Sequence, residues 1–156
     1  MVTLFGKPES VKAEVTAIEV PATEGPRRID TQASVVFRYP GMSASVLYSK
    51  AADSRLRTEI SGEKGSISLD QIHITRQAEM IVRGAPTSGR SEGAKPEDIT
   101  AVCDPDEYLC EFREFIDLIL SGRTESVNNS LDNSVAVAEI IDQIRAQGGI
   151  VFPADA

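Results

Sequence analysis

The chain has 156 residues and a formal net charge of −8, a length that fits a single domain. Hydrophobic residues make up 41% and charged residues 26%, which is typical of a globular protein and excludes a disordered, collagen-like or coiled-coil chain. Because nucleic acids and anionic lipids are bound by cationic surfaces, we expect neither nucleic-acid nor membrane partners. No apolar run has the length of a membrane span and no secretory signal is visible, so we expect a cytoplasmic protein.

The residues that most often carry metal or hydrolytic chemistry are scarce. Cys103 and Cys110 cannot form a disulfide framework or a four-ligand zinc site, and we expect both as reduced thiols. His73 is the one histidine, and no serine or cysteine can be paired with it from the sequence. A solvated or interface histidine is therefore favoured over a catalytic one. The sequence predicts no catalytic, cofactor or metal site within the chain.

The first half of the chain is expected to form strands. Val11, Ala13 and Val15 alternate with polar residues, which is the period of a half-buried strand. Gly62–Gly65, read as GEKG, is typical of a hairpin turn. The expected strands span residues 11–20, 31–39, 43–49, 55–60, 66–69 and 72–82.

Residues 83–103 are rich in glycine, serine and proline and are expected to form a long loop. A loop of this length is either a mobile surface segment or a segment that contacts a partner or substrate. The sequence leaves both interpretations open.

Two helices are expected after this loop. Asp104, Asp106 and Glu107 surround a proline, and helix capping explains this acidic group better than a metal or acid site does. Apolar residues then recur at helical spacing as far as Gly122, a C-terminal stop signal.

The second helix is expected to begin near Asn129 or Ser130 and to end before Gly148. Ile150–Phe152 is expected to add a short last strand. The predicted class is therefore α+β, with an open, mainly antiparallel sheet of about six to seven strands and helices packed on one face. The uncovered sheet face is expected to be an interaction surface.

Several segments resemble the C-terminal domain of the Gfo/Idh/MocA oxidoreductases. LFGKPESVKAEV resembles the stretch in which a helix ends and the first strand begins, and IDTQASVVFRYPGMSASVLYS resembles an Asp-led second strand, a turn and the third strand. EISGEKGSISLD resembles the family's hairpin. YLCEFREFIDLILSGRTES and LDNSVAVAEIIDQIRAQGGIVFP resemble the two closing helices and a final strand, most similar to the dihydrodiol and xylose dehydrogenase branch.

The resemblance implies that residues 1–156 form the substrate-side and oligomerisation domain of an oxidoreductase that acts on a sugar or cyclic diol. It implies that NAD or NADP, the catalytic lysine and a second catalytic His or Tyr belong to an N-terminal Rossmann domain before Met1, with Met1 inside the helix that follows. This chain alone is then expected to be inactive. The resemblance gives neither the individual substrate nor the choice between NAD and NADP.

The resemblance also places the start of the second strand near a small-molecule substrate. It implies Arg28, Asp30 and Gln32 as substrate-binding residues, of which the aspartate matches the family pattern best. It further implies a homo-oligomer that packs through the open sheet face. A natural stand-alone module of the same fold, used for binding or dimerisation without catalysis, is the alternative.

Overall fold

The structure, a computed structural model, describes residues 1–21, 27–83, 95–101 and 108–152. The chain divides into two compact units. The first unit combines residues 1–53 with residues 118–156, and the second unit comprises residues 54–117. Helix α2 (Leu109–Leu120) contains the boundary between the two.

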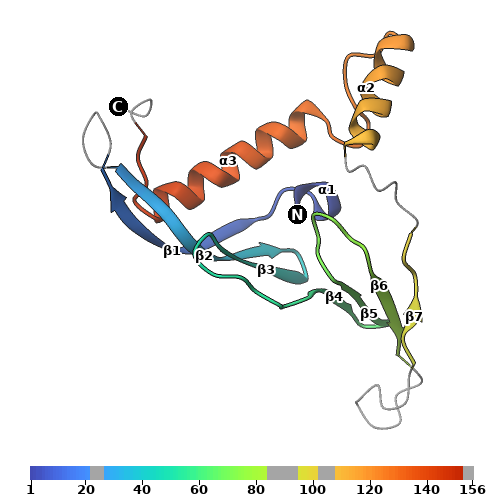
Figure 1. Ribbon diagram of the computed structural model, residues 1–156, viewed down its shortest axis with the longest axis horizontal. Coiled ribbons are helices and arrows are strands. Elements are labelled where there is room, and N and C mark those ends of the chain that lie inside the picture. Colours follow the sequence, from blue (N-terminus) through green and yellow to red (C-terminus); the bar gives the residue numbers. More distant parts are fainter. Residues whose placement is uncertain (22–26, 84–94, 102–107, 153–156) are drawn as a thin grey trace. The chain divides into compact units, whose positions relative to one another are not determined.

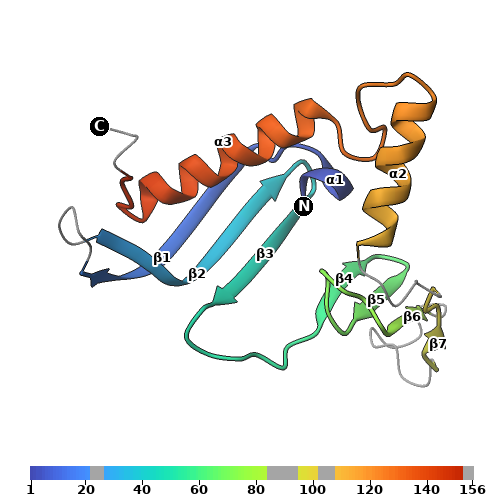
Figure 2. The same cartoon turned by 45° about the horizontal axis from the view of Figure 1, so that its top comes forward.

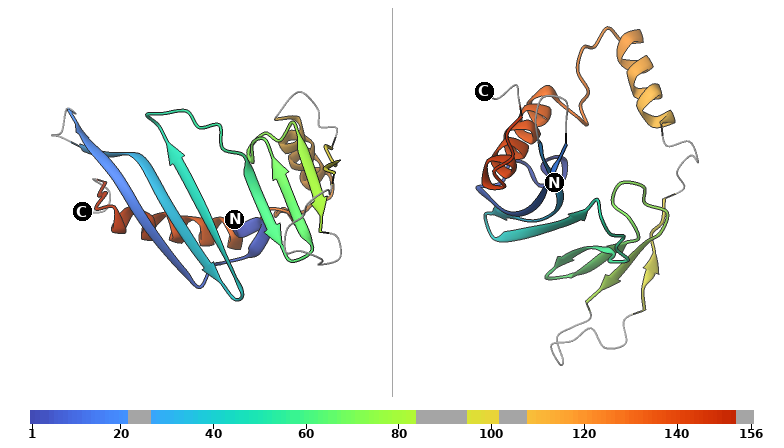
Figure 3. Two further views of the ribbon diagram at one scale, coloured as in Figure 1. Left: turned by 90° about the horizontal axis from the view of Figure 1, so that it is seen from below. Right: turned by 60° about the vertical axis from the view of Figure 1, so that its left-hand side comes forward.

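The first unit is built on a three-stranded antiparallel sheet. Its strands follow one another in space as β1 (Ser10–Val20), β2 (Arg27–Tyr39) and β3 (Met42–Ser49). The short helix α1 (Val2–Phe5) precedes the sheet, and the long helix α3 (Leu131–Gln147) lies across one side of it (Figures 1 and 2). When the sheet is seen from its other side, α3 passes behind the three strands (Figure 3, left).

The core of the first unit lies between this sheet and α3. Residues directly opposite one another on neighbouring strands share a face, so Val11, Phe37 and Ala44 all point to one side. Val35 on the same face is only 2% exposed, and Ile140 of α3 completes the buried cluster. The side that carries α3 is called the helix face below, and the opposite side is called the open face.

The open face of the same sheet presents a different set of side chains. Val36 is 44% exposed and Leu47 is 65% exposed, and both stand among serines such as Ser34 and Ser45. The alternation in the sequence sorts the residues of β2 and β3 into two faces, and the structure shows that the face with Val35 and Ala44 is the one that packs on α3.

The second unit contains a four-stranded antiparallel sheet. In order, its strands are β4 (Thr58–Gly62), β5 (Gly65–Leu69), β6 (Ala78–Val82) and β7 (Glu97–Asp98). The predicted hairpin turn between β4 and β5 is confirmed. β7 falls within residues 83–103, which the sequence predicts as loop throughout, and it pairs with β6.

The predicted strand over residues 72–82 is wrong in its first half, because β6 begins only at Ala78. A local hydrogen-bond system explains the difference: the Asp70 carboxylate accepts from the backbone N–H of Arg76 at 3.0 Å and of Gln77 at 3.1 Å. Aspartate side chains compete with strand ladders in this way and favour turns. His73 lies in this turn and is exposed.

Helix α2 ends as the sequence predicts. Gly122 has φ 65°, and the backbone N–H groups of Gly122 and Arg123 donate to the carbonyls of Ile119 at 3.1 Å and Leu118 at 2.9 Å. This is a Schellman motif with glycine at its left-handed position. No residue of α2 is buried, and Cys110 on it is a free, exposed thiol. Cys103 and the acidic group that includes Asp104, Asp106 and Glu107 lie outside the described residues.

Helix α3 begins at the predicted cap, since the Ser130 hydroxyl accepts from the Asn133 N–H at 3.1 Å. The predicted strand at Ile150–Phe152 is wrong. Gly149 has φ 62°, and the Ile150 N–H donates to the carbonyl of Arg145 at 3.0 Å. This second Schellman turn folds the chain back along α3, where Ile150 is 6% exposed and the Arg145 guanidinium stands 4.1 Å from the Phe152 ring centre.

The predicted α+β class is confirmed, with antiparallel strands and with α3 packed on one face of a sheet. The prediction of one continuous sheet needs correction, because the strands of the described residues pair as a three-stranded and a four-stranded sheet. Within the part of the chain that the structure describes, no helix has the length and apolar character needed to cross a membrane.

Candidate functional site

A β-bulge lies at the start of β2, beside the predicted site residues. Thr16 of β1 is opposite Gln32, whereas the next residue, Ala17, is opposite Asp30, so Thr31 is one extra residue on β2. An extra residue reverses the side to which the following side chains point. Because Ala17 shares a face with Val15, Asp30 is turned onto the helix face of the sheet.

The bulge brings the Asp30 carboxylate to two side chains of the neighbouring strand. The Tyr48 hydroxyl donates a hydrogen bond to Oδ2 of Asp30. The Lys50 ammonium donates to Oδ1 at 2.9 Å and forms an ion pair. Asp30, Tyr48 and Lys50 are called the Asp30 cluster below. The Asp30 side chain keeps 24% of its surface exposed, so the carboxylate remains accessible to a small molecule.

The electrostatics of the cluster fix its protonation states. The hydrogen bond from Tyr48, followed by the contact with Lys50, lowers the pKa of Asp30. Burial, followed by the hydrogen bond to Asp30, raises the pKa of Tyr48 to about 12. Near neutral pH the aspartate is therefore ionised and the tyrosine protonated, so the cluster offers a fixed hydrogen-bond acceptor rather than a general acid or base.

Arg28 lies on the same helix face, farther along β2. It is opposite Glu19, two residues beyond Ala17 on β1. Its guanidinium Nη1 is 3.3 Å from the position that a Cβ atom on Gly149 would occupy. Gly149 follows the C-terminal end of α3, where exposed carbonyl groups favour a positive charge. The structure thus brings Arg28 and Asp30 to one end and one face of the sheet.

Gln32 takes the opposite side. It stands before the bulge, opposite Thr16, and its Nε2 donates to the Thr16 hydroxyl oxygen at 3.4 Å. The three predicted substrate residues are therefore divided, with Arg28 and Asp30 on the helix face and Gln32 on the open face.

Sequence reasoning did not identify Tyr48 and Lys50 as members of this site. The alternation of β3 does place Tyr48 on the side of Ala44 and Val46, which is the helix face. That signal is incomplete, because a regular β2 would leave Asp30 on the other side of the sheet. Only the shifted register brings the carboxylate and the phenol together.

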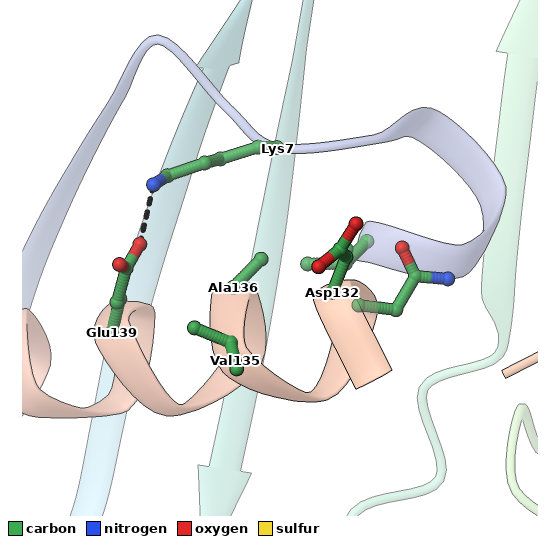
Figure 4. Close-up of a pocket in the computed structure, with 7 residues that line it drawn as sticks. Lys7, Asp132, Val135, Ala136 and Glu139 are labelled. Carbon is green, nitrogen blue, oxygen red and sulfur yellow. Dashed lines mark hydrogen bonds and ion pairs between the residues drawn. The ribbon is translucent and has the colours of Figure 1, made fainter. Parts of the chain in front are cut away.

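A separate pocket of about 340 Å³ lies between α1 and the start of α3. Figure 4 shows Lys7 reaching Glu139 across its edge, and the two side chains form an ion pair. Asp132 lines the same hollow. The ionisable side chains that line this pocket are Lys7, Asp132 and Glu139, and none of the predicted substrate residues is among its lining residues.

The described residues contain neither a parallel β–α–β unit nor a cluster of metal-ligating side chains. Both sheets are antiparallel throughout their described strands, whereas a dinucleotide pyrophosphate is held by the helix of a parallel β–α–β unit. In the same part of the chain, no group of three or more His, Cys, Asp or Glu side chains gathers to ligate an ion. The chemistry that the Asp30 cluster offers is that of an ionised carboxylate, which accepts hydrogen bonds from hydroxyl groups.

We expect the Asp30 cluster to make the free energy of unfolding decrease as the pH falls below about 4. The folded state lowers the pKa of Asp30, so the unfolded chain binds the proton more readily. The contribution is complete above the ordinary carboxyl pKa of about 4 and is lost as the pH falls through the lower folded value. Urea denaturation from pH 6 to pH 2 should show a smaller loss for Asp30→Asn than for the original chain. Equal losses would contradict the prediction.

One family model matches this chain: the GFO/IDH/MocA C-terminal domain matches residues 1–68. Among curated proteins, scyllo-inositol 2-dehydrogenase (NADP(+)) IolU of Bacillus subtilis is 34% identical over 155 residues, which are 99% of this chain and 42% of that protein. The uncharacterized oxidoreductase YgjR of Escherichia coli is 29% identical over 154 residues, with 99% and 42% covered. The chain thus spans about two-fifths of the length of both relatives.

Solved structures give the same fold. UDP-N-acetylglucosamine 3-dehydrogenase GnnA from Acidithiobacillus ferrooxidans superposes with a TM-score of 0.65 at 19% identity, over 94% of this chain and 44% of that one. At this identity the likeness concerns the fold alone. The predicted family resemblance is confirmed by these comparisons, while its placement in the dihydrodiol and xylose dehydrogenase branch stays a prediction.

Proposed function

We propose, from the premise that this chain belongs to the Gfo/Idh/MocA family as a C-terminal domain, that the intact protein is an NAD(P)-dependent oxidoreductase acting on a sugar, polyol or cyclic diol. One observation carries the proposal: 99% of the chain aligns at 34% identity with an NADP(+)-dependent scyllo-inositol 2-dehydrogenase. The Asp30 cluster supports it, because a carboxylate beside a lysine suits a substrate with several hydroxyl groups.

In this proposal the chain binds and orients the substrate and does not itself transfer a hydride. Following the family resemblance, we assign NAD or NADP to an N-terminal Rossmann domain of the intact protein. Arg28 and Asp30 form part of the substrate wall from the helix face. Gln32 lies on the open face, so a contact of Gln32 with substrate requires a neighbouring subunit or domain on that face, apart from the wall that Arg28 and Asp30 form.

The test compares two proteins: the intact protein translated from the complete reading frame, and the 156-residue chain alone. NADP and NAD reduction is followed at 340 nm with scyllo-inositol, myo-inositol, D-xylose and D-glucose. We expect turnover by the intact protein and none by the chain alone. Turnover by the chain alone would overturn the assignment. A stop codon directly upstream of Met1 would support the alternative, a stand-alone binding or dimerisation module.

We further propose that two copies pack through the open face of the first unit. An apolar sheet face of this kind, with Leu47 65% exposed and Val36 44% exposed among serines, is typical of an interaction surface. A two-fold axis would place each residue against the same patch of the partner.

Leu47→Glu should therefore convert the oligomer into monomers, because two carboxylates, one from each copy, would be forced into a shared apolar contact without partners. Leu56→Glu is the matched control, since Leu56 is a 75% exposed leucine outside the sheet. Sedimentation velocity at micromolar concentration distinguishes the two results. A clean monomer for the original intact protein, or an unchanged oligomer for Leu47→Glu, contradicts the proposed interface.

A further inference from the structure

We infer that Tyr48 and Lys50 are positioning residues that hold the Asp30 carboxylate as an acceptor for the hydroxyl groups of a polyol substrate. The inference rests on the proposed function and goes beyond it, because it assigns roles to two residues outside the predicted site. It also makes the bulge at Thr31 the device that builds the site.

Backbone hydrogen bonds at the bulge fix the direction of Asp30. An extra residue in one strand leaves a ladder position unpaired, which costs stability unless something compensates. Here the Lys50 N–H donates to the carbonyl of Thr31 at 2.7 Å, and the Thr31 hydroxyl donates to the carbonyl of Thr16 at 3.1 Å. The bulge is thus fixed from both neighbouring strands, and the direction of Asp30 is fixed with it.

The Asp30 carboxylate can accept a further hydrogen bond. An ionised carboxylate offers about four lone-pair sites on its two oxygens. Tyr48 uses one site on Oδ2 and Lys50 uses one on Oδ1. The backbone N–H of Asp30 itself is a third donor to the carboxylate. The carboxylate therefore keeps a site for a further donor, and the side chain is exposed enough, at 24%, to receive one.

Asp30 and Lys50 together match a ligand with neighbouring hydroxyl groups. The Lys50 ammonium has three N–H donors, of which the contact with Asp30 uses one. An acceptor and a donor side by side match two neighbouring hydroxyl groups, of which one donates to Asp30 and the other accepts from Lys50. Arg28 on the same face adds a second donor at the end of α3. A neutral polyol or sugar fits this pattern.

Two supporting side chains hold the Asp30 carboxylate in one orientation. An aspartate carboxylate that nothing holds can rotate about its side-chain bonds, and a contact with substrate needs a defined orientation. One hydrogen bond to each oxygen fixes the plane of the Asp30 carboxylate. Without Tyr48 or Lys50 the acceptor remains in the site, but it no longer has one orientation.

A purely structural tie between β2 and β3 would use the same three side chains, so the experiment must separate the two roles. The variants are Asp30→Asn, Tyr48→Phe and Lys50→Met in the intact protein, with scyllo-inositol as the probe. Tyr39→Phe is the matched tyrosine control, because the buried Tyr39 hydroxyl has no hydrogen-bond partner among the described residues. Lys64→Met, in the turn between β4 and β5, is the lysine control.

The expected result is a rise in KM for scyllo-inositol of about tenfold for Tyr48→Phe and Lys50→Met, and of at least that size for Asp30→Asn. The value of kcat should change less than KM, as for an interaction present in the ground state and the transition state alike. KM for the dinucleotide and both control variants should stay within about twofold of the original protein.

Unchanged KM values in Tyr48→Phe and Lys50→Met, with only a lower melting temperature, would overturn the inference and leave the proposed function intact. An original protein that reduces neither NAD nor NADP with any of the four polyols and sugars would overturn the proposed function itself, and this inference with it. The two failures are therefore distinguishable.

Discussion

Val35→Asp is expected to unfold the first unit. Val35 is 2% exposed on the helix face of β2, within the cluster that includes Phe37 and Ile140. The substitution removes buried apolar surface and places a carboxylate among the apolar side chains of this cluster. Burying an unpaired charge costs about 4 kcal/mol or more, which is comparable with the whole stability of many domains, about 5–15 kcal/mol.

The neighbouring position provides the control. Val36→Asp makes the same change one residue farther along β2, where the side chain is 44% exposed on the open face. We expect it to change the free energy of unfolding of a single copy by less than about 1 kcal/mol, while its effect on the proposed contact between copies is measured separately by sedimentation. Urea denaturation followed by circular dichroism measures both variants. Similar losses at the two positions would show that the sheet does not have one buried and one open side.

The contrast between these two valines is the part of the fold that the sequence predicts best. A period of two along β1, β2 and β3 assigns each residue to one face without any knowledge of strand order. Short turns then make the strands antiparallel neighbours. Helix ends were equally predictable, because Ser130 and Gly122 act through contacts with backbone groups within a few residues.

The candidate site was predictable only in part. Asp30 and Arg28 follow from the family resemblance, but alternation alone groups Asp30 with Gln32 and separates it from Tyr48. The bulge at Thr31 reverses that assignment, and nothing in the local residue pattern marks it. A register shift depends on how two strands pair across the sheet, so it is a property of tertiary structure rather than of local propensity.

The wrong strand predictions have a related cause. Residues 72–77 and Ile150–Phe152 contain the apolar residues of a strand. Local hydrogen bonds nevertheless fix the backbone of both segments in turns. In the first segment the Asp70 carboxylate accepts hydrogen bonds from two backbone N–H groups. In the second segment the Schellman turn at Gly149 directs the chain back along α3. The division into two sheets is likewise absent from the sequence, because turn signals indicate which strands follow one another but not where pairing stops.

Gly65→Ala is expected to destabilise the second unit by about 3 kcal/mol. Gly65 begins β5 opposite Val82 of β6. A Cβ atom there would lie 2.1 Å from the carbonyl oxygen of Ile81 and 3.1 Å from Cα of Val82. These are backbone atoms, so no side-chain rotation can relieve the overlap. The β5–β6 pairing must open at this end or the hairpin must shift.

Gly62→Ala tests whether the effect comes from this contact or from the loss of any glycine in the turn. A Cβ atom on Gly62 meets nothing closer than the Gly65 carbonyl oxygen at 3.7 Å, an ordinary contact. Its expected effect on unfolding free energy is below about 1 kcal/mol, with either sign. Hydrogen exchange at the Ile67 and Met80 amides should report faster opening in Gly65→Ala alone. Equal protection in both variants would contradict the close pairing of β5 and β6. Position 65 requires glycine only because the two backbones approach closely there.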